Sequence, residues 1–139
     1  MTATETMPRE TYGVKPIGRT ELVERNGSAM LRRGLTEALS IAGLEAGHSL
    51  RWIEDESGEM LVGVGLEYKV DGRAEPRARP IREENQGFVV SIPPAVLDVL
   101  GIDDVDELNG GRELELFATD GLIAIAPVQE REIVVDVDS

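Results

Sequence analysis

One pattern occurs twice along the chain, and it constrains the fold more than any other feature of the sequence. "VVSIPPAVLDVLGI" spans residues 89–102, and the related "MLRRGLTEALSI" spans residues 30–41. Just upstream, "ERNG" (24–27) coincides with "ENQG" (84–87) when the sequence is shifted by 60 positions. A shift of 61 then superimposes the apolar residues Leu31, Leu35 and Leu39 on Ile92, Val96 and Leu100.

The correspondence continues downstream with small changes of spacing. A shift of 64 aligns Leu50 and Trp52 with Leu114 and Leu116, and a shift of 63 aligns Met60 and Val62 with Ile123 and Ile125. The insertions fall at expected turns, where insertions are tolerated. A repeat of this kind predicts two copies of one supersecondary unit.

Each copy has the same expected order of elements. A strand leads to a turn at Gly27 or Gly87, and a second strand is followed by a short helix, an alternating strand, a turn and a closing strand. The helices have one apolar face at i, i+3, i+4 spacing, formed by Leu35, Ala38 and Leu39 in one copy and by Val96, Val99 and Leu100 in the other. The sequence therefore predicts a mostly β fold with two short helices.

The prolines of the second copy mark a sharp corner between strand and helix. Proline suits the first turn of a helix, because its φ is already helical and its missing N–H loses no bond there. We expect the helix to begin at or after Pro94, to end at Gly101, and to turn Leu97 away from its apolar face. In the first copy Ser40 stands at the position of Gly101 and is a poorer stop signal.

Each copy contains only about 40–45 residues, which is rarely enough to bury a core alone. The residues 65–80 between the copies could reach roughly 50 Å when extended, so both copies can pair within one chain. We expect one barrel with pseudo-two-fold symmetry. The expected divisions are a flexible N-terminal arm (1–18), repeat 1 (19–68), a linker (69–80), repeat 2 (81–128) and an acidic C-terminal tail (129–139).

The second copy resembles the swapped-hairpin AbrB/MazE/SpoVT family. The resemblance lies in "SIPPAVLDVLGI", in "LELFATDGLIAIAP" and in their spacing, and the repeat extends it to "MLRRGLTEALSI" and "AGHSLRW". In this family two ββαββ copies, usually from two chains, interleave their hairpins into one β-barrel. The resemblance implies that this chain is an intramolecular pseudo-dimer of two tandem ββαββ repeats.

Members of this family bind DNA as transcription regulators or as antitoxins, through basic residues near the first hairpin and the helix start. Arg33 occupies the position of the family's lysine after the proline, Arg32 replaces that proline, and Arg25 lies in the first hairpin turn. The second copy has Pro94 where the family has lysine. The resemblance therefore implies a sequence-specific, AbrB-type regulator that contacts double-stranded DNA mainly through repeat 1.

We assign DNA contacts to two groups of arginines. The first copy supplies Arg19, Arg25, Arg32 and Arg33, and the connection supplies Arg73, Arg77, Arg79 and Arg82. The planar guanidinium fork suits phosphate and guanine. The alternative for the first group is a solvated helix start, and for the second group a linker whose arginines are interspersed with acidic residues.

The charge of the chain is strongly acidic and uneven. Asp and Glu number 27 against 14 Lys and Arg, a net charge of −13, and only Lys15 and Lys69 are lysines. Residues 1–82 carry 13 acids and 12 bases, whereas 83–139 carry 14 acids and 2 bases. This composition is typical of the cytoplasm of an extreme halophile. It also leaves an alternative function open, an antitoxin-like or protein-binding module whose acidic second repeat holds a protein partner.

Several other classes of function are not expected from this sequence. It has no cysteine, no apolar run long enough for a membrane helix and no apolar N-terminal leader, so we expect a cytoplasmic protein. "DDVDELNG" (103–110) fails the calcium-loop pattern, and no nucleophile–base motif is present, so we expect no metal, cofactor or enzymatic activity.

Only about a dozen residues follow Pro127, which favours a regulator over an antitoxin with a long toxin-binding tail. Whether two such pseudo-dimers associate into a homodimer is left open by the sequence.

The acid excess predicts that folding depends on salt. The Debye length falls from about 10 Å at 0.1 M salt to about 3 Å at 1 M, so concentrated KCl screens the mutual repulsion of the carboxylates. We expect the thermal unfolding midpoint to rise between 0.1 and 3 M KCl, measured by circular dichroism. An unchanged midpoint over that range would contradict both the salt requirement and the halophilic interpretation.

Overall fold

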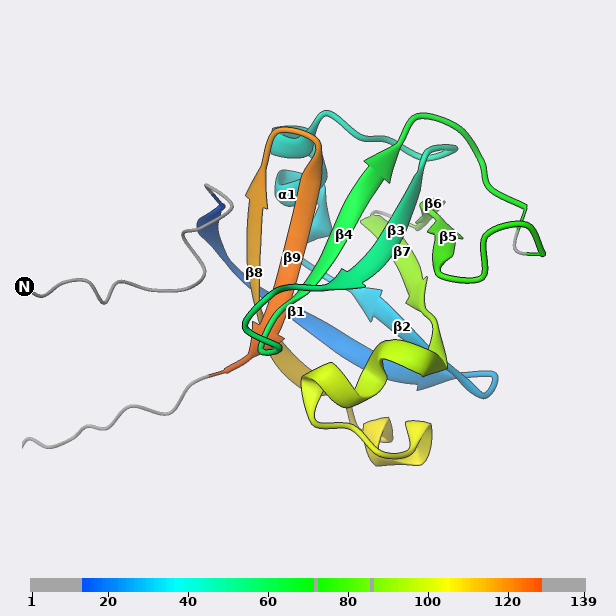
Figure 1. The fold of residues 1–139 in the computed structure, drawn as a ribbon, viewed down its shortest axis with the longest axis vertical. Coiled ribbons are helices and arrows are strands. Elements are labelled where there is room, and N and C mark those ends of the chain that lie inside the picture. The colour runs from blue at the N-terminus through cyan, green and yellow to red at the C-terminus, as the bar shows by residue number, and fades with distance from the viewer. Residues whose placement is uncertain (1–13, 72, 86, 129–139) are drawn as a thin grey trace, which may run out of the picture.

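The computed structural model describes residues 14–71, 73–85 and 87–128, which form one antiparallel sheet with short helices (Figure 1). The predicted mostly β fold is confirmed, and the second predicted helix forms as a 3₁₀ helix. No helix in these ranges is long and apolar enough to cross a membrane. The elements are β1 (Lys15–Arg25), β2 (Ser28–Arg32), α1 (Leu35–Ala42), β3 (Ser49–Glu54), β4 (Leu61–Leu66), β5 (Ala78–Pro80), β6 (Arg82–Glu84), β7 (Gly87–Ile92), the 3₁₀ helices η3 (Pro94–Leu100) and η4 (Val105–Leu108), β8 (Arg112–Thr119) and β9 (Leu122–Pro127).

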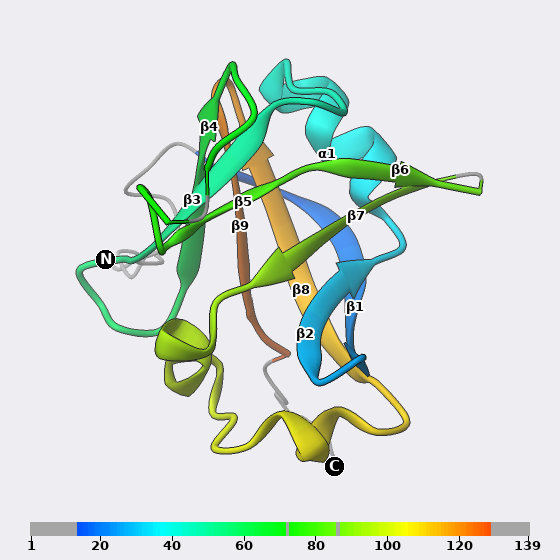
Figure 2. The ribbon, with the colours of Figure 1, turned by 90° about the vertical axis from the view of Figure 1, so that its right-hand side faces the viewer.

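The sheet curls into a nearly closed barrel. Its strand order is β5-β3-β4-β9-β8-β1-β2-β7-β6. The two edge strands β5 and β6 are separated only by Ile81, so both edges belong to one extended segment that runs along the opening (Figure 2). Ser49 of β3 pairs with Pro80 on one side of this segment, and Val89 of β7 pairs with Arg82 on the other.

The hairpins of the first half of the chain pair with strands of the second half. The β1–β2 hairpin lies between β8 and β7, and the β3–β4 hairpin lies between β5 and β9. β1 and β2 therefore have neither β3 nor β4 as a neighbour in the sheet. The core between these strands is shared by both halves, as the size of each copy requires.

The main core fills the barrel, and helices close its two ends. α1 covers one end, and η3 with η4 lies at the other (Figures 1 and 2). Trp52 on β3 is fully buried, and its indole Nε1 donates to the Ser91 carbonyl oxygen at 3.2 Å. The opposite residue on β4 is Gly63, where an added Cβ would lie 3.0 Å from the Trp52 ring. The absence of a side chain at Gly63 therefore leaves room for the tryptophan ring.

The helix predictions are partly correct. η3 begins at Pro94 and is followed by Gly101 with φ 77°, as predicted. α1 extends past Ser40 to Ala42 and is ended by Gly43, which adopts the left-handed conformation that favours glycine. The prediction that Leu97 faces outward is wrong, since Leu97 is buried with Leu100. A 3₁₀ helix has three residues per turn, which brings positions 97 and 100 onto one face.

The predicted alignment of the two closing strands with each other, Met60 with Ile123 and Val62 with Ile125, is wrong by one residue. Ile123 and Ile125 lie in the main core, whereas Met60 and Val62 pack with Phe117 in a separate cluster. A one-residue slip moves a side chain to the other face of a sheet, and the loop 55–60 is longer than the turn 120–121. The turn predicted at Gly87 lies one residue earlier, because Gly87 already pairs with Glu84 in β7.

The connection between the halves is held against β3. Glu75 forms an ion pair with Arg51, and the Tyr68 hydroxyl donates to Glu75 at 2.9 Å. Hydrogen bonds from Arg51 and Tyr68 lower the pKa of the Glu75 carboxyl. Two expected boundaries differ from the structure, because β1 begins at Lys15 inside the expected arm and β5 lies inside the expected linker. The rest of the arm (1–13) and the tail (129–139) lie outside the described residues.

Candidate nucleic-acid interface

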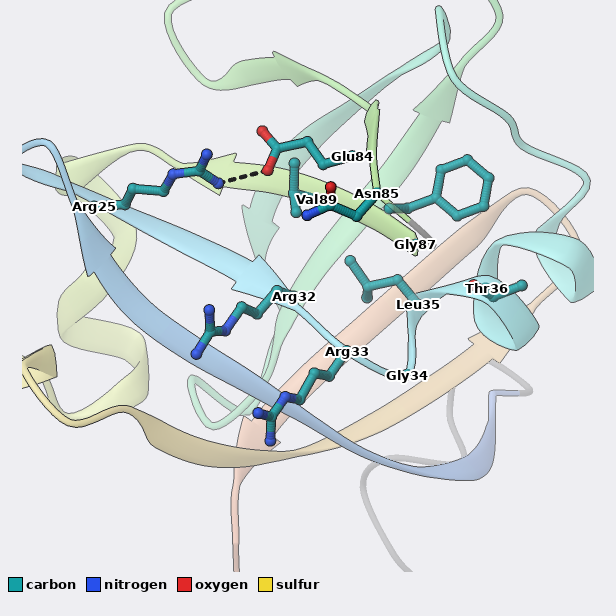
Figure 3. A pocket seen from close by; sticks show the side chains of 11 residues that line it. Arg25, Arg32, Arg33, Gly34, Leu35, Thr36, Glu84, Asn85, Gly87 and Val89 are labelled. Carbon is teal, nitrogen blue, oxygen red and sulfur yellow. Dashed lines mark hydrogen bonds and ion pairs between the residues drawn. The ribbon is translucent and has the colours of Figure 1, made fainter.

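Three of the predicted DNA-contacting arginines line one groove. Arg25, Arg32 and Arg33 project from the β1–β2 hairpin and the corner that follows it (Figure 3). The groove has a volume of about 520 Å³, and the β6–β7 hairpin forms its other wall. The remaining lining residues are Gly34, Leu35, Thr36, Glu84, Asn85, Gly87, Phe88 and Val89. The groove therefore contains residues from both halves of the chain.

The corner between β2 and α1 fixes where Arg32 and Arg33 emerge. Arg33 and Gly34 both adopt positive φ, 72° and 73°, so the chain reverses sharply before the helix. The Thr20 hydroxyl lies 2.9 Å from the Arg32 carbonyl oxygen and 2.8 Å from that of Arg33. Thr20 is 2 % exposed, so the hydroxyl that holds the corner against β1 comes from a buried residue.

Each arginine of the first copy has a carboxylate nearby. The distances are 2.8 Å from Arg19 Nη1 to Glu113 Oε1 and 2.6 Å from Arg25 Nη1 to Glu84 Oε1. Arg32 Nε and Arg33 Nε lie 3.0 and 3.5 Å from the same oxygen of Glu21. The bond from Arg25 lowers the pKa of the Glu84 carboxyl. Because one carboxylate serves two arginines, the groove keeps an excess of positive charge even when its ion pairs are formed.

The predicted cluster in the connection is dispersed. Arg79 Nη1 donates to the Pro76 and Ala78 carbonyl oxygens at 2.8 Å, and its side chain lines a different cavity, next to Asp103 and Asp104. Arg82 lies 4.0 Å from Glu84 and so borders the arginine groove. Arg73 and Arg77 are exposed. Arg79 and Arg82 therefore lie at different cavities.

Sequence reasoning missed the acidic residues that hold the arginines. Glu21 is the cross-strand partner of Arg32, and Arg25 pairs with Ser28 around the Asn26–Gly27 turn. An Asn-Gly turn of two residues fixes the register of a hairpin, so counting back from it identifies the Glu21–Arg32 pair. The contact of Glu84 with Arg25 has no such local signal, because it joins two hairpins that are far apart in the sequence.

A second charged surface surrounds η3 and η4. Asp98, Asp103, Asp104, Asp106 and Glu107 are all exposed there. The Asp104 side chain accepts from the Asp106 amide at 3.0 Å and caps η4. In the part of the chain that the structure describes, no group of three potential ligands is arranged to hold a metal ion.

Comparisons with protein-family models, with curated proteins and with solved structures find no match to this chain. The fold and the groove by themselves define a small antiparallel barrel with an arginine-lined groove between two hairpins.

The corner between β2 and α1 leads to a prediction about stability. At Gly34 an added Cβ would lie less than 3.0 Å from the Arg19 carbonyl oxygen, whereas at Gly43 nothing lies within 4 Å. Both glycines have positive φ, so an alanine at either position costs roughly 1–2 kcal/mol of backbone strain. We expect Gly34→Ala to lower the free energy of unfolding clearly more than Gly43→Ala, measured by chemical denaturation. Equal losses would show that the corner can relax away from β1.

Proposed function

We propose that the chain is a swapped-hairpin barrel of the AbrB/MazE/SpoVT type, built from two tandem ββαββ repeats. The first hairpins of the two halves correspond: Arg25 pairs with Ser28 and Glu84 pairs with Gly87, and the asparagine after each strand, Asn26 or Asn85, has positive φ, 56° and 53°. Leu22 lies three residues before Arg25, and Ile81 lies three residues before Glu84. Both Leu22 and Ile81 are buried. These correspondences support one structural unit used twice.

The strand pairing supports the same proposal. Thr20 of β1 pairs with Leu114 of β8, and Arg79 of β5 pairs with Leu50 of β3. Leu50 and Leu114 are the residues that the sequence repeat aligns. β2 pairs with β7 and β4 pairs with β9, each antiparallel, as expected for equivalent strands that meet at a pseudo-two-fold axis.

We further propose that the protein is a sequence-specific DNA-binding transcription regulator, working in the cytoplasm of an extreme halophile. The observation that carries this proposal is the gathering of Arg25, Arg32 and Arg33 at one groove. Their side chains are 47 %, 48 % and 71 % exposed, so a ligand can reach them. Arginine forks can bind phosphate oxygens and the O6 and N7 atoms of guanine.

The contacts are expected mainly from repeat 1. Counted from the turns, Arg25 corresponds to Glu84 and Arg32 corresponds to Ser91, so repeat 2 lacks the arginines at these positions. A regulator with one basic hairpin and one acidic hairpin would present unequal surfaces to the two strands of DNA. This favours an asymmetric target over a palindromic one.

The alternative is a protein-binding module, including an antitoxin-like one. It is favoured by the exposed acidic residues around η3 and η4, which repel DNA and could hold a basic protein partner. The DNA proposal uses the arginine groove, whereas the alternative uses the acidic residues around η3 and η4. Substitutions in the groove therefore distinguish the two proposals.

Removal of two groove arginines tests the DNA proposal. We expect Arg32→Ala with Arg33→Ala to weaken specific binding by at least about tenfold, because one bidentate arginine–base pair is worth about 1–3 kcal/mol. The measurement is fluorescence anisotropy on promoter fragments, at a salt concentration where the fold is stable.

The matched control is Lys15→Ala with Lys69→Ala, which removes the same charge at exposed positions outside the groove. A bulk electrostatic effect predicts equal losses for the two double variants. Equal affinities, or no sequence-specific binding by the wild type to any genomic fragment, would favour the protein-binding alternative.

A further inference from the structure

Glu21 lies at the centre of the contacts behind the groove. It is in the middle of β1, with Arg32 opposite it on β2 and Glu113 opposite it on β8. Its Oε1 atom lies 3.0 Å from Arg32 Nε and 3.5 Å from Arg33 Nε. One carboxylate oxygen therefore contacts two consecutive arginines that leave the strand at the corner.

The atoms used in these contacts are informative. Arg32 and Arg33 both face Glu21 with Nε, whereas Arg19 and Arg25 face their carboxylates with a terminal Nη1. The two terminal nitrogens of an arginine can together make a bidentate contact with a guanine base or a phosphate. Within the described residues, the hydrogen bond from the Arg32 side chain is donated by Nε, and the ion-pair contact of Arg33 is also made at Nε. Glu21 thus holds these two side chains and leaves their terminal nitrogens available.

Glu21 is itself confined from the opposite side. Its carboxylate lies over Gly111, just before β8, where an added Cβ would lie less than 3.0 Å from Oε2. The Glu21 side chain is 23 % exposed, against 71 % for Arg33. A half-buried carboxylate beside a strand is a more rigid anchor than an exposed one, because fewer rotamers are open to it.

We propose that Glu21 is a positioning residue that orients the Arg32–Arg33 pair so that their terminal nitrogens contact one site on DNA. This inference rests on the proposed DNA-binding function and adds a residue that acts through the arginines. A positioning role predicts a change in DNA affinity opposite to the one expected from charge alone. Removing an acid beside a DNA surface normally strengthens binding, whereas removing a positioning acid weakens it.

The test compares wild type, Glu21→Leu and Glu21→Gln with Glu113→Gln as the control. Glu113 is the neighbour of Glu21 in the sheet, contacts Arg19 and is 62 % exposed, so its substitution removes the same charge one strand away. We expect Glu21→Leu to weaken specific binding by about tenfold, the value of one well-oriented contact. Glu21→Gln keeps an oxygen acceptor and is expected to restore part of the loss, while Glu113→Gln binds at least as well as wild type.

A second measurement reports on positioning without DNA. Arginine Nε–H signals in nuclear magnetic resonance spectra are expected to lose hydrogen-exchange protection for Arg32 in Glu21→Leu and to keep it in Glu113→Gln. Specific binding by the wild type together with equal or tighter binding by Glu21→Leu would overturn the positioning role and leave the proposed function standing. Absence of specific binding by the wild type would overturn both, and unchanged Arg32 protection in Glu21→Leu would overturn the positioning role alone.

Discussion

The pairing between the two halves of the chain is the interaction on which the rest of the structure depends. A half of this size rarely buries a core alone, and strands of each half pair with strands of the other in the sheet. The contacts of β2 with β7 and of β4 with β9 close this arrangement. Trp52 shows the same dependence, since its ring lies in the shared core and its indole donates to Ser91 of the second half.

The same pairing creates the candidate interface. Because β2 lies beside β7, the arginines of the first hairpin face the turn of the β6–β7 hairpin, and Arg25 meets Glu84 across the join. Arg25 of the first half and Glu84 of the second thus form an ion pair between the two hairpins. In the function that we propose, the first half contacts DNA through its arginines, and residues 84–89 of the second half line the other side of the groove.

The fold could largely be predicted from the sequence because its main signals are local. Pro94 and Gly101 mark the start and end of the second helix. The alternation of apolar and polar residues around Leu50 and Leu114 predicts two strands, which the structure contains. The errors arose where geometry depends on contacts elsewhere. Leu97 faces inward because its helix is 3₁₀, and Met60 changes face because a loop is longer in one copy. The ion pair of Arg25 with Glu84 joins segments that are far apart in the sequence, so the local sequence pattern could not predict it.

Amide chemical shifts of the wild-type protein, measured while a promoter fragment is added, test the central claim most directly. The account predicts the largest changes at the residues that line the arginine groove, which are Arg25, 32–36, 84–85 and 87–89, and little change at residues 94–110 around η3 and η4. Changes confined to residues 94–110, or an unchanged spectrum in the presence of excess DNA, would contradict it.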